Sequence, residues 1–400
     1  MIKRKFVEEL FKAFYIQRWN DKIRPVELME MDKHAHKMFI TYSIGKYEEL
    51  NGKEVNWDEI IRGGIYELFR RIVISDIKSP IYYKIKQENK ETFHKLNTWV
   101  YDQLGSLIHD EEIKEDFREY LVNDKYLSER SQRILDASHK YASFWEFKII
   151  KHANPEGFQI QTIERDLYRA IGNYLDFEAM RKIMSREPIA EFIDLCAQLR
   201  FQTRWAQMPR VPKTSVLGHS MMVAVLAYFF ARENDACPKR LFNNFYCGLF
   251  HDLPEAVTRD IISPVKKSSE DFMNLIKKIE KDLAEKEIYP LIEREWAEEV
   301  RYFTEDEFSN KIFKSGKVFT DLNVDDINKN YNEDEYNPLD GDLVKAADHL
   351  SAFLEAWHSS RFGIESEEFV VAMNSVKNEY MNRTIGKLPI HKIFDSFVIE

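Results

Sequence analysis

The chain has 400 residues, of which 44% are hydrophobic and 14% aromatic, and this is enough apolar material for two well-packed domains rather than one. Its formal net charge of −10 and pI near 5.7 argue against nucleic acid as a partner, because binding to a phosphate backbone depends on clustered Lys and Arg. We therefore expect a small polar ligand.

The beginning of the chain, residues 1–19, carries charges among its apolar positions, unlike the uninterrupted apolar core of a signal peptide. No later stretch approaches the roughly 18 apolar residues that a membrane-spanning helix needs. Three cysteines, Cys196, Cys237 and Cys247, form no CxxC pair and are expected to be reduced thiols. These features predict a cytoplasmic protein with no membrane partner.

Helical periodicity dominates the chain, and Gly (13) and Pro (12) are scarce. Apolar residues recur every three or four positions in several segments, which predicts amphipathic helices within 189–201, 220–232, 272–287 and 343–358. The sequence contains no convincing run of alternating strand residues. The predicted fold class is all-α.

Two short motifs occur twice in the same order. Arg18-Trp19 is repeated as Arg204-Trp205, an offset of 186 (204 − 18), and SDIKSP at 75–80 is repeated as RDIISP at 259–264, an offset of 184 (259 − 75). Chance matches are the alternative, but the common register favours a tandem duplication. The start of the chain then projects to about residue 187, so we place a first domain at 1–186 and a second at 187–400.

Four side chains of the second copy could converge on one divalent cation: His219, the adjacent pair His251-Asp252, and Asp348. Each lies in an apolar, helix-like segment, where an unpaired polar group would be costly. Two imidazoles and two carboxylates suit one divalent transition-metal ion (Mn, Fe, Co, Ni or Zn) better than they suit Mg²⁺. Such an ion, with open coordination positions for water and substrate, makes a hydrolytic centre.

The adjacency of two of these candidates has a structural consequence. His251 and Asp252 would point about 100° apart on a helix, so both can bind one ion where the helix faces the cleft squarely or ends there. Pro254, soon after the pair, fits a disturbed helix end. Glu255 lies one turn beyond His251, where a residue that orients or deprotonates the attacking water should be.

Each candidate also has a purely structural interpretation. A single histidine such as His219 on an apolar helix is more often a hydrogen-bonded core residue, and Asp348 could be a buried carboxylate that pairs helices. A second His-Asp dipeptide, His109-Asp110, lies among acidic residues and is interpreted as unrelated to the site. The combination of candidates in order is what favours a metal site.

The first copy lacks a counterpart of the His-Asp pair. The two offsets match the candidates with a different set of residues: His219 falls near His34, His251 on Glu67, Asp252 on Leu68, Glu255 on Arg71, and Asp348 loosely on 136–139. The first copy is therefore expected to hold no metal, although it keeps Arg18 and Trp19.

Four stretches of the second half resemble the HD-domain metal-dependent phosphohydrolases, most closely the bacterial 5′-deoxynucleotidase branch. They are RWAQM at 204–208, VLGHS at 216–220, HDLPEAVTRD at 251–260 with SPVK at 263–266, and KAAD at 345–348. The resemblance implies two tandem HD-like helical bundles, of which the first is degenerate and the second catalytic.

The resemblance also implies a role for individual residues. The metal ligands would be His219, His251, Asp252 and Asp348, and the catalytic acids would be Glu255 and Asp260. Arg204 and Trp205 would contact the phosphate and close the pocket against a 2′-hydroxyl, and Lys266 would be a further phosphate contact. These roles agree with the chemistry, because an Arg can bind a phosphate through two hydrogen bonds and an indole face can exclude a hydroxyl.

The implied activity is that of a 5′-deoxynucleotidase, which releases phosphate from deoxyribonucleoside 5′-monophosphates. A dNTP triphosphohydrolase or a cyclic-nucleotide phosphodiesterase would use the same ligands, and a non-catalytic nucleotide-binding regulator is a further alternative. The chain departs from the family at Gly218, where relatives carry an acidic residue, and in the loop 210–217. Substrate identity, base preference and the native metal therefore stay open.

Members of this family are typically single-domain homodimers of about half this length. The resemblance therefore implies that the two copies pack as an intrachain pseudo-dimer with one working site. A further homodimer of full-length chains stays open.

Overall fold

The fold was determined as a computed structural model, which describes residues 2–75, 77–259, 269–364 and 366–398. These residues are mainly helical, so the all-α prediction is confirmed. The exception is a small antiparallel hairpin of β1 (Ile312–Lys314) and β2 (Lys317–Phe319), with Ile312 opposite Phe319. Strands of three residues are too short to produce an alternating pattern, and the sequence did not predict them.

Helices of the first half begin near the N-terminus and end at Met184. They are α1 (Arg4–Phe11), η1 (Lys12–Phe14), α2 (Glu30–Leu50), α3 (Trp57–Val73), α4 (Ser79–Glu88), α5 (Lys90–Leu104), η2 (Gly105–Leu107), α6 (Glu111–Val122), α7 (Glu129–Ala153), α8 (Ile160–Gly172) and α9 (Glu178–Met184).

Helices of the second half begin at Pro188, which takes the first helical position of α10. They are α10 (Pro188–Gln198), η3 (Leu199–Phe201), α11 (Val216–Arg232), α12 (Pro238–Phe250), α13 (Glu255–Thr258), α15 (Glu270–Glu287), η4 (Tyr289–Leu291), α16 (Arg294–Thr304), α17 (Val324–Asn330), η5 (Asp334–Tyr336), α18 (Gly341–Arg361), α19 (Glu367–Glu379) and α20 (His391–Asp395). All four segments predicted as amphipathic helices are helical in the structure.

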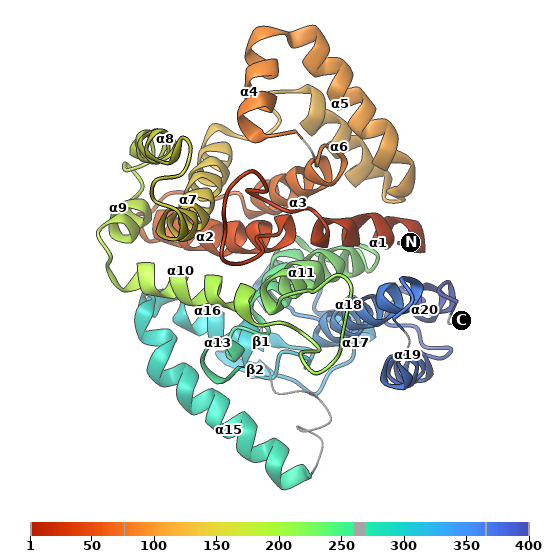
Figure 1. Cartoon of the computed structure of the whole chain (residues 1–400). Coiled ribbons are helices and arrows are strands. Elements are labelled where there is room, and N and C mark those ends of the chain that lie inside the picture. Colours follow the sequence, from red (N-terminus) through yellow and green to blue (C-terminus); the bar gives the residue numbers. More distant parts are fainter. Residues whose placement is uncertain (1, 76, 260–268, 365, 399–400) are drawn as a thin grey trace.

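The two halves are stacked on each other, with α2 and α11 at the centre (Figure 1). In the first half α2 packs against α3 and α7, and in the second half α11 packs against α12 and α18. The contact between α2 and α11 joins the two groups, and one continuous hydrophobic core runs through both halves. The halves are therefore two bundles that share one core.

The same local structure occurs twice at the entrance to these central helices. An isolated antiparallel bridge joins Gln17 to Met29 in the first half, and another joins Thr203 to Ser215 in the second. Between the bridged residues, Trp19 and Trp205 both adopt the left-handed region, with φ of 55° and 56°, which non-glycine residues seldom do. The shared offset of 186 (205 − 19) extends the repeat seen in the sequence to the backbone.

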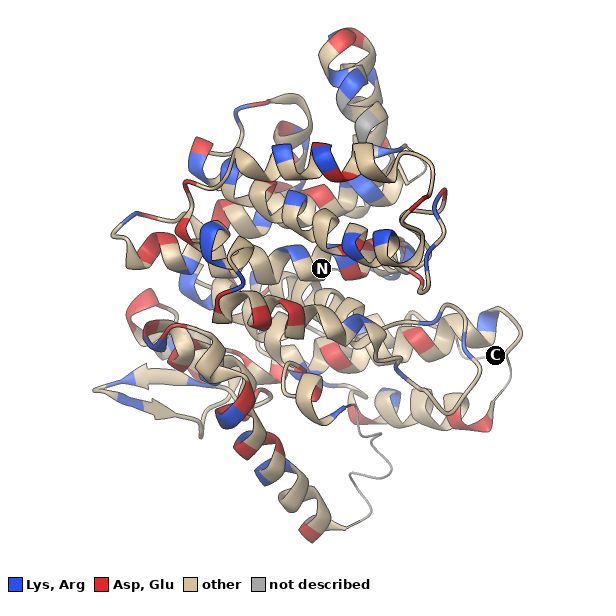
Figure 2. Cartoon of the chain, turned by 60° about the vertical axis from the view of Figure 1, so that its left-hand side comes forward, with Lys and Arg blue, Asp and Glu red and all other residues tan. Residues whose placement is uncertain are grey.

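Charged residues of both signs are interspersed along the helices of both halves in Figure 2. This mixture agrees with the modest negative net charge of the chain. Among the described residues, the structure contains no helix that is both long enough and apolar enough to cross a bilayer.

Candidate metal centre

The candidate metal centre lies where α11 and α12 cross at close range. A Cβ atom on Gly248 of α12 would come within 2.8 Å of the Ala224 Cα atom of α11, so the missing side chain lets the two backbones approach. His219 lies on α11 before Ala224, and His251 follows Gly248. The close crossing brings the two imidazole rings to a centroid distance of 5.4 Å.

The two adjacent candidates lie at the end of α12. His251 is the C-cap residue of this helix, and Asp252 lies in the turn that leads to α13. This is the helix end that adjacent His and Asp ligands require. One potential ligand atom from each of His219, His251 and Asp252 lies within 4.8 Å of the others, so these three residues could hold one metal ion.

Asp348 reaches the same place from α18. Its Oδ1 atom lies 2.9 Å from His219 Nε2, while Asp252 Oδ2 lies 3.3 Å from His251 Nε2. Both histidines are buried, whereas the side chains of Asp252 and Asp348 keep 17% and 19% of their surface exposed. The structure thus brings three predicted ligands into one group and places the fourth, Asp348, against His219, with both carboxylates partly exposed to solvent.

Hydrogen bonds to the other ring nitrogens orient both imidazoles. His251 Nδ1 lies 2.8 Å from the carbonyl oxygen of Gly248, which can only accept, so this nitrogen carries the hydrogen. His219 Nδ1 lies 2.9 Å from Ser351 Oγ. When neutral, His251 therefore has its lone pair on Nε2, and the Nε2 atoms of both rings lie beside the carboxylates, where a metal ion could bind them. The residues present therefore fit a divalent transition-metal ion.

The electrostatics of the site favour a cation. Burial opposes ionisation of Asp348, but the hydrogen bond and charge of His219 outweigh it and hold the pKa of Asp348 far below its usual range. Burial likewise opposes protonation of His251, but the Asp252 carboxylate outweighs it and raises the pKa of His251 to about 9. The carboxylates thus stabilise a proton on His251. A metal ion would compete with that proton for Nε2.

Arg204 and Trp205 flank this centre and are held by a buried glutamate of α18. Glu355 accepts hydrogen bonds from Arg204 Nε (3.2 Å) and Trp205 Nε1 (2.9 Å). A third bond, from Thr214 Oγ1 (2.5 Å), ties the loop 210–217 to the same carboxylate. Arg204 Nη1 lies 3.6 Å from Asp252 Oδ2, so the guanidinium group borders the candidate ligands.

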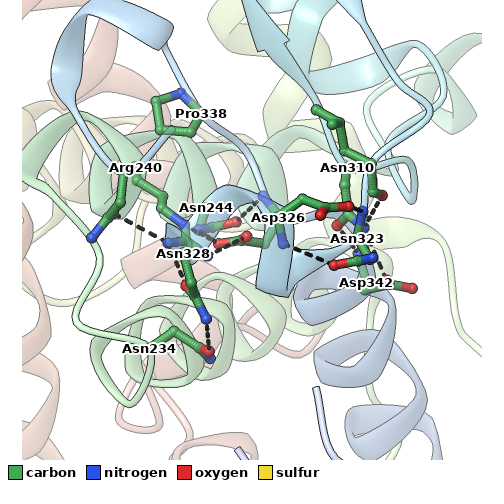
Figure 3. A network of polar contacts seen from close by, with 12 residues as sticks. Asn234, Arg240, Asn244, Asn310, Asn323, Asp326, Asn328, Pro338 and Asp342 are labelled. Atoms are coloured by element: carbon green, nitrogen blue, oxygen red, sulfur yellow. Dashed lines mark hydrogen bonds and ion pairs between the residues drawn. The ribbon is translucent and has the colours of Figure 1, made fainter. Parts of the chain in front are cut away.

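A buried polar network holds the start of α18 against α12 (Figure 3). Arg240 of α12 donates two hydrogen bonds to Asp340, from Nε (2.7 Å) and from Nη2 (2.6 Å), and Asn244 donates a third (2.8 Å). Arg240 also donates to Asn328 of α17. Because α12 leads to His251 and α18 carries Asp348, this network sets the separation of two helices that supply ligands.

Of the remaining predicted site residues, Glu255, Asp260 and Lys266, the structure describes only Glu255. Glu255 is buried at the first position of α13, and its backbone carbonyl accepts a hydrogen bond from Gln202 Nε2 (2.8 Å). The helix is interrupted between His251 and Glu255, so the one-turn relation expected from the sequence does not hold as a continuous helical face. Asp260 and Lys266 lie outside the described residues.

Two residues that support the site were not identified from the sequence. Ser351 follows Asp348 by three positions on α18, and Glu355 follows Ser351 by four. This spacing places all three on one helical face, which is a signal the sequence contained. Which serine or glutamate would meet which partner depended on the packing of α18 against the other helices.

The corresponding place in the first half contains lysines instead of a metal-binding set. The offset of 186 (219 − 33) matches His219 with Lys33 rather than with the neighbouring His34. Lys33 Nζ lies 2.7 Å from His139 Nδ1, and Glu67 Oε1 lies 2.8 Å from the same nitrogen. Lys37 donates to the other oxygen of Glu67. Two buried lysines thus belong to this cluster, and burial lowers the pKa of Lys33 to about 7.

Further ion pairs fill the first-half site. Arg18, the counterpart of Arg204, lies between Glu146 (2.8 Å from Nε) and Glu30 (2.9 Å from Nη1). Arg71, the residue matched with Glu255, also contacts Glu30, at 3.4 Å. In the second half Val216 stands in the register of Glu30. Arg18 thus pairs with a second carboxylate, Glu30, in a register where the second half has a valine.

The other His-Asp dipeptide has a separate structural role. Asp110 is the N-cap of α6, where it accepts a hydrogen bond from the backbone of Ile113, and it pairs with Arg232 of the second half at 2.8 Å. These contacts agree with the interpretation that His109-Asp110 is unrelated to the metal centre.

Both halves match known families. Residues 196–377 match the family described as HD domain, and residues 5–179 match the family described as 5′-deoxynucleotidase YfbR-like. A 5′-deoxynucleotidase of Yersinia pseudotuberculosis is 24% identical over 197 residues, which cover 48% of this chain and 83% of that protein. A 5′-deoxynucleotidase of Cronobacter sakazakii is 24% identical over 200 residues, 48% of this chain and 84% of its own.

These matches confirm the resemblance, the tandem arrangement of two such units and the expected class, a metal-dependent hydrolase. The 5′-deoxynucleotidase family matches the half in which Lys33 and Glu67 stand at ligand positions. The half with the candidate ligands matches the broader HD family.

Proposed function

We propose that this metal-dependent hydrolase is a 5′-deoxynucleotidase with one metal centre, located in the second half at His219, His251, Asp252 and Asp348. The observation that carries the proposal is the convergence of two imidazoles and two carboxylates, with Arg204 Nη1 only 3.6 Å from Asp252 Oδ2. Cation-binding side chains and a guanidinium group that can grip a phosphate thus lie next to each other.

A divalent cation in this set would supply Lewis-acid activation of water and of a phosphate oxygen. Arg204 binds the phosphate and offsets the charge that grows on its oxygens during attack. Glu255, which is buried and follows the His251-Asp252 pair closely in the chain, accepts the proton of the attacking water. Water attacks phosphorus, the bond from phosphorus to the 5′-oxygen breaks, and that oxygen takes up a proton, which gives a deoxynucleoside and inorganic phosphate.

Trp205 is the residue that would distinguish deoxyribose from ribose. Its backbone is held at positive φ and its indole nitrogen is bonded to Glu355, so the ring is fixed before a substrate arrives. A fixed indole face can exclude a 2′-hydroxyl by its bulk. Asp260 and Lys266 are proposed from the resemblance alone, as an acid near the attacking water and as a phosphate contact.

The first domain (1–186) then serves as the partner of the second (187–400) in an intrachain pseudo-dimer. A nucleotide-binding role for the first domain is less well supported, because Glu30 already engages Arg18 and Lys33 stands in the place of a metal ligand. The chemistry of the site favours a small-molecule nucleotide as the partner.

The test joins metal analysis of the purified protein to a product-resolved nucleotide assay. With Mn²⁺ or Co²⁺, deoxyribonucleoside monophosphates should release inorganic phosphate, and His251→Ala and Asp252→Ala should abolish this release because each removes a ligand. His109→Ala, in the other His-Asp dipeptide, is the matched control and should retain full activity.

Equal turnover by Asp252→Ala and the wild type would contradict the metal centre. Release of triphosphate from deoxynucleoside triphosphates, or of a linear nucleotide from a cyclic one, in place of phosphate release would replace the nucleotidase by one of the two related activities.

A further inference from the structure

We propose that Asp32 of the first half is a positioning residue for the metal centre of the second half, because its carboxylate holds Ser215, the N-cap of the helix that carries His219. The inference rests on the proposed metal centre. It assigns to the half without metal ligands a specific contribution to the site, beyond its packing.

The contact is a short chain of hydrogen bonds. Ser215 Oγ donates to Asp32 Oδ1 at 2.7 Å and accepts from the backbone N–H of Gly218 at 2.9 Å. The carbonyl oxygen of Ser215 accepts from the backbone N–H of His219 at 3.0 Å. A hydroxyl has a single hydrogen, so donation to Asp32 turns its lone pairs toward Gly218. The first turn of α11 is thereby oriented by a residue from the other half.

The packing around this bond leaves no room for a side chain at Gly218 of α11. A Cβ atom on Gly218 would lie 2.6 Å from Asp32 Oδ1 and 2.8 Å from Phe14 Cε1, both in the first half. Asp32 and Ser215 are buried, so water is a poor substitute for either partner. The residue directly before His219 is thus a glycine because the first half occupies the space beside it.

The repeat offers two equivalent positions for such a contact between the halves, and only one of them is used. In the register of the repeat, Asp32 corresponds to Gly218 (218 − 32) and Ser215 corresponds to Met29 (215 − 29). The mirror-image contact would need an acid at 218 and a hydroxyl at 29, and the cap of α2 makes no side-chain hydrogen bond. Of two equivalent contacts, the structure contains the one that serves the helix with a metal ligand.

Asp32 is suited to act as an acceptor. Burial raises its pKa to about 6, with the charge of Arg200 opposing, so the carboxyl group is mainly ionised at neutral pH. An ionised carboxylate accepts hydrogen bonds and donates none. It therefore leaves Ser215 a single arrangement, in which the serine donates to Asp32 and accepts from Gly218.

The test measures the affinity for Mn²⁺ by calorimetry and the thermal midpoint of the metal-free protein, in full-length variants. Asp32→Leu and Ser215→Ala should each weaken Mn²⁺ binding by about tenfold, the lower end of the effect of residues that orient metal ligands. Asp32→Asn keeps an acceptor oxygen and should restore most of the affinity. The double variant should be no worse than Ser215→Ala, because the loss of the serine hydroxyl already removes the bond to Asp32.

Tyr42→Phe is the matched control. It removes another hydrogen bond between the halves, from Tyr42 to Glu299 of α16 (2.7 Å), and this bond involves no residue of α11. We expect a lower thermal midpoint and an unchanged affinity for Mn²⁺. If Asp32→Leu does not fold, Asp32→Ala, which also removes the acceptor, takes its place.

Wild-type affinity in the folded variant without an acceptor at position 32, or in Ser215→Ala, would overturn this inference alone. An equal loss of Mn²⁺ affinity in Tyr42→Phe would also overturn it, because general docking of the halves would then be the cause. A wild-type protein that binds no Mn²⁺ or other divalent transition metal would overturn the proposed metal centre as well, so the two failures are distinguishable.

Discussion

At the scale of single residues, the candidate ligands are oriented by neighbours that never touch the ion. His251 Nδ1 donates to a backbone carbonyl, which no side-chain substitution can remove, but His219 Nδ1 depends on the hydroxyl of Ser351. In a fully buried place, the loss of that partner leaves the ring nitrogen without a hydrogen bond. The geometry of His219 is therefore the more easily disturbed.

Ser351→Ala should weaken binding of Mn²⁺ or Co²⁺ by roughly 10- to 100-fold, the range for residues that hold a metal-binding histidine. Calorimetric titration of the full-length protein measures this. Ser220→Ala is the control, because Ser220 is equally buried and next to His219, but its hydroxyl donates to the carbonyl of Val216 within α11. Equal affinities in the two variants would show that Ser351 does not orient the ligand.

At the scale of elements, the site depends on how closely α11 and α12 cross. The two halves differ at equivalent positions of this crossing. Gly248 faces the backbone of Ala224, whereas Gly64, its equivalent at the offset of 184 (248 − 64), faces the flexible side chain of Met38 with Sδ at 2.6 Å from a notional Cβ. Met38 occupies the position equivalent to Ala224 at the offset of 186 (224 − 38). Its flexible side chain can move aside, but the helix backbone at Ala224 cannot.

Gly248→Ala should therefore lower the free energy of unfolding by about 1–3 kcal/mol, the usual cost of adding a methyl group to a tightly packed core. It should also weaken metal binding, since it pushes His219 and His251 apart. Gly64→Ala is the matched control and should cost less, with unchanged metal affinity. Urea unfolding and calorimetry measure the two effects, and an equal cost at both glycines would contradict the argument.

At the scale of the whole molecule, polar contacts between the halves surround the shared core. Glu299 of α16 lies at the centre of one set: Lys46 of α2 contacts it at 2.6 Å, Tyr42 donates to it at 2.7 Å, and Lys239 of α12 lies at 3.0 Å. Burial opposes ionisation of Glu299, but the charges of Lys46 and Lys239 outweigh it and lower its pKa to about 2. The ionised form therefore stabilises the contact between the halves.

This shift gives a pH dependence of definite sign. A carboxyl group with a lowered pKa in the folded state stabilises it above the unfolded pKa, near 4.5, and this contribution is lost as the pH falls toward 2. At about 1.4 kcal/mol per pKa unit the full loss is up to about 3 kcal/mol, of which about 2 kcal/mol falls between pH 6 and pH 3 and should be absent in Glu299→Gln. Urea unfolding at pH 6 and at pH 3 measures the difference.

Glu298→Gln is the control for this measurement. Glu298 is the neighbouring residue, exposed over 80% of its side chain and paired within its own helix with Arg301. Exposed ion pairs contribute little, so its pH dependence should match the wild type. The same loss of stability in Glu299→Gln as in the wild type would show that Glu299 does not link the halves in its ionised form.

Much of the fold and of the site followed from local patterns. Apolar spacing predicted the helices, and α10 starts at Pro188, next to the predicted boundary between the two copies. The repeated Arg-Trp pair predicted the duplication because the same turn, with a left-handed tryptophan, recurs at both places. His251-Asp252 followed by Pro254 predicted a helix end, and α12 ends at Phe250.

Other features depended on which elements meet. The small hairpin at 312–319 is too short for a periodic signal, and the register that matches His219 with Lys33 rather than His34 became clear from the paired bridges. The sequence predicted that Glu255 lies one helical turn after His251. Because α12 ends before Glu255, this spacing does not apply. Ser351 and Glu355 have ordinary sequence surroundings, and their partners come from α11 and from the loop 210–217.

The sequence by itself determined the helical class and the tandem repeat and supplied four candidate ligands, because periodicity, motif spacing and ligand chemistry are properties of the chain. Only the tertiary structure decided which neighbours orient those side chains and that Glu30 and two lysines occupy the first-half site. It also decided that Asp32 reaches across to the cap of α11. These contacts join residues more than 100 positions apart or belong to one copy alone, and distances between such residues are set by helix packing rather than by local sequence.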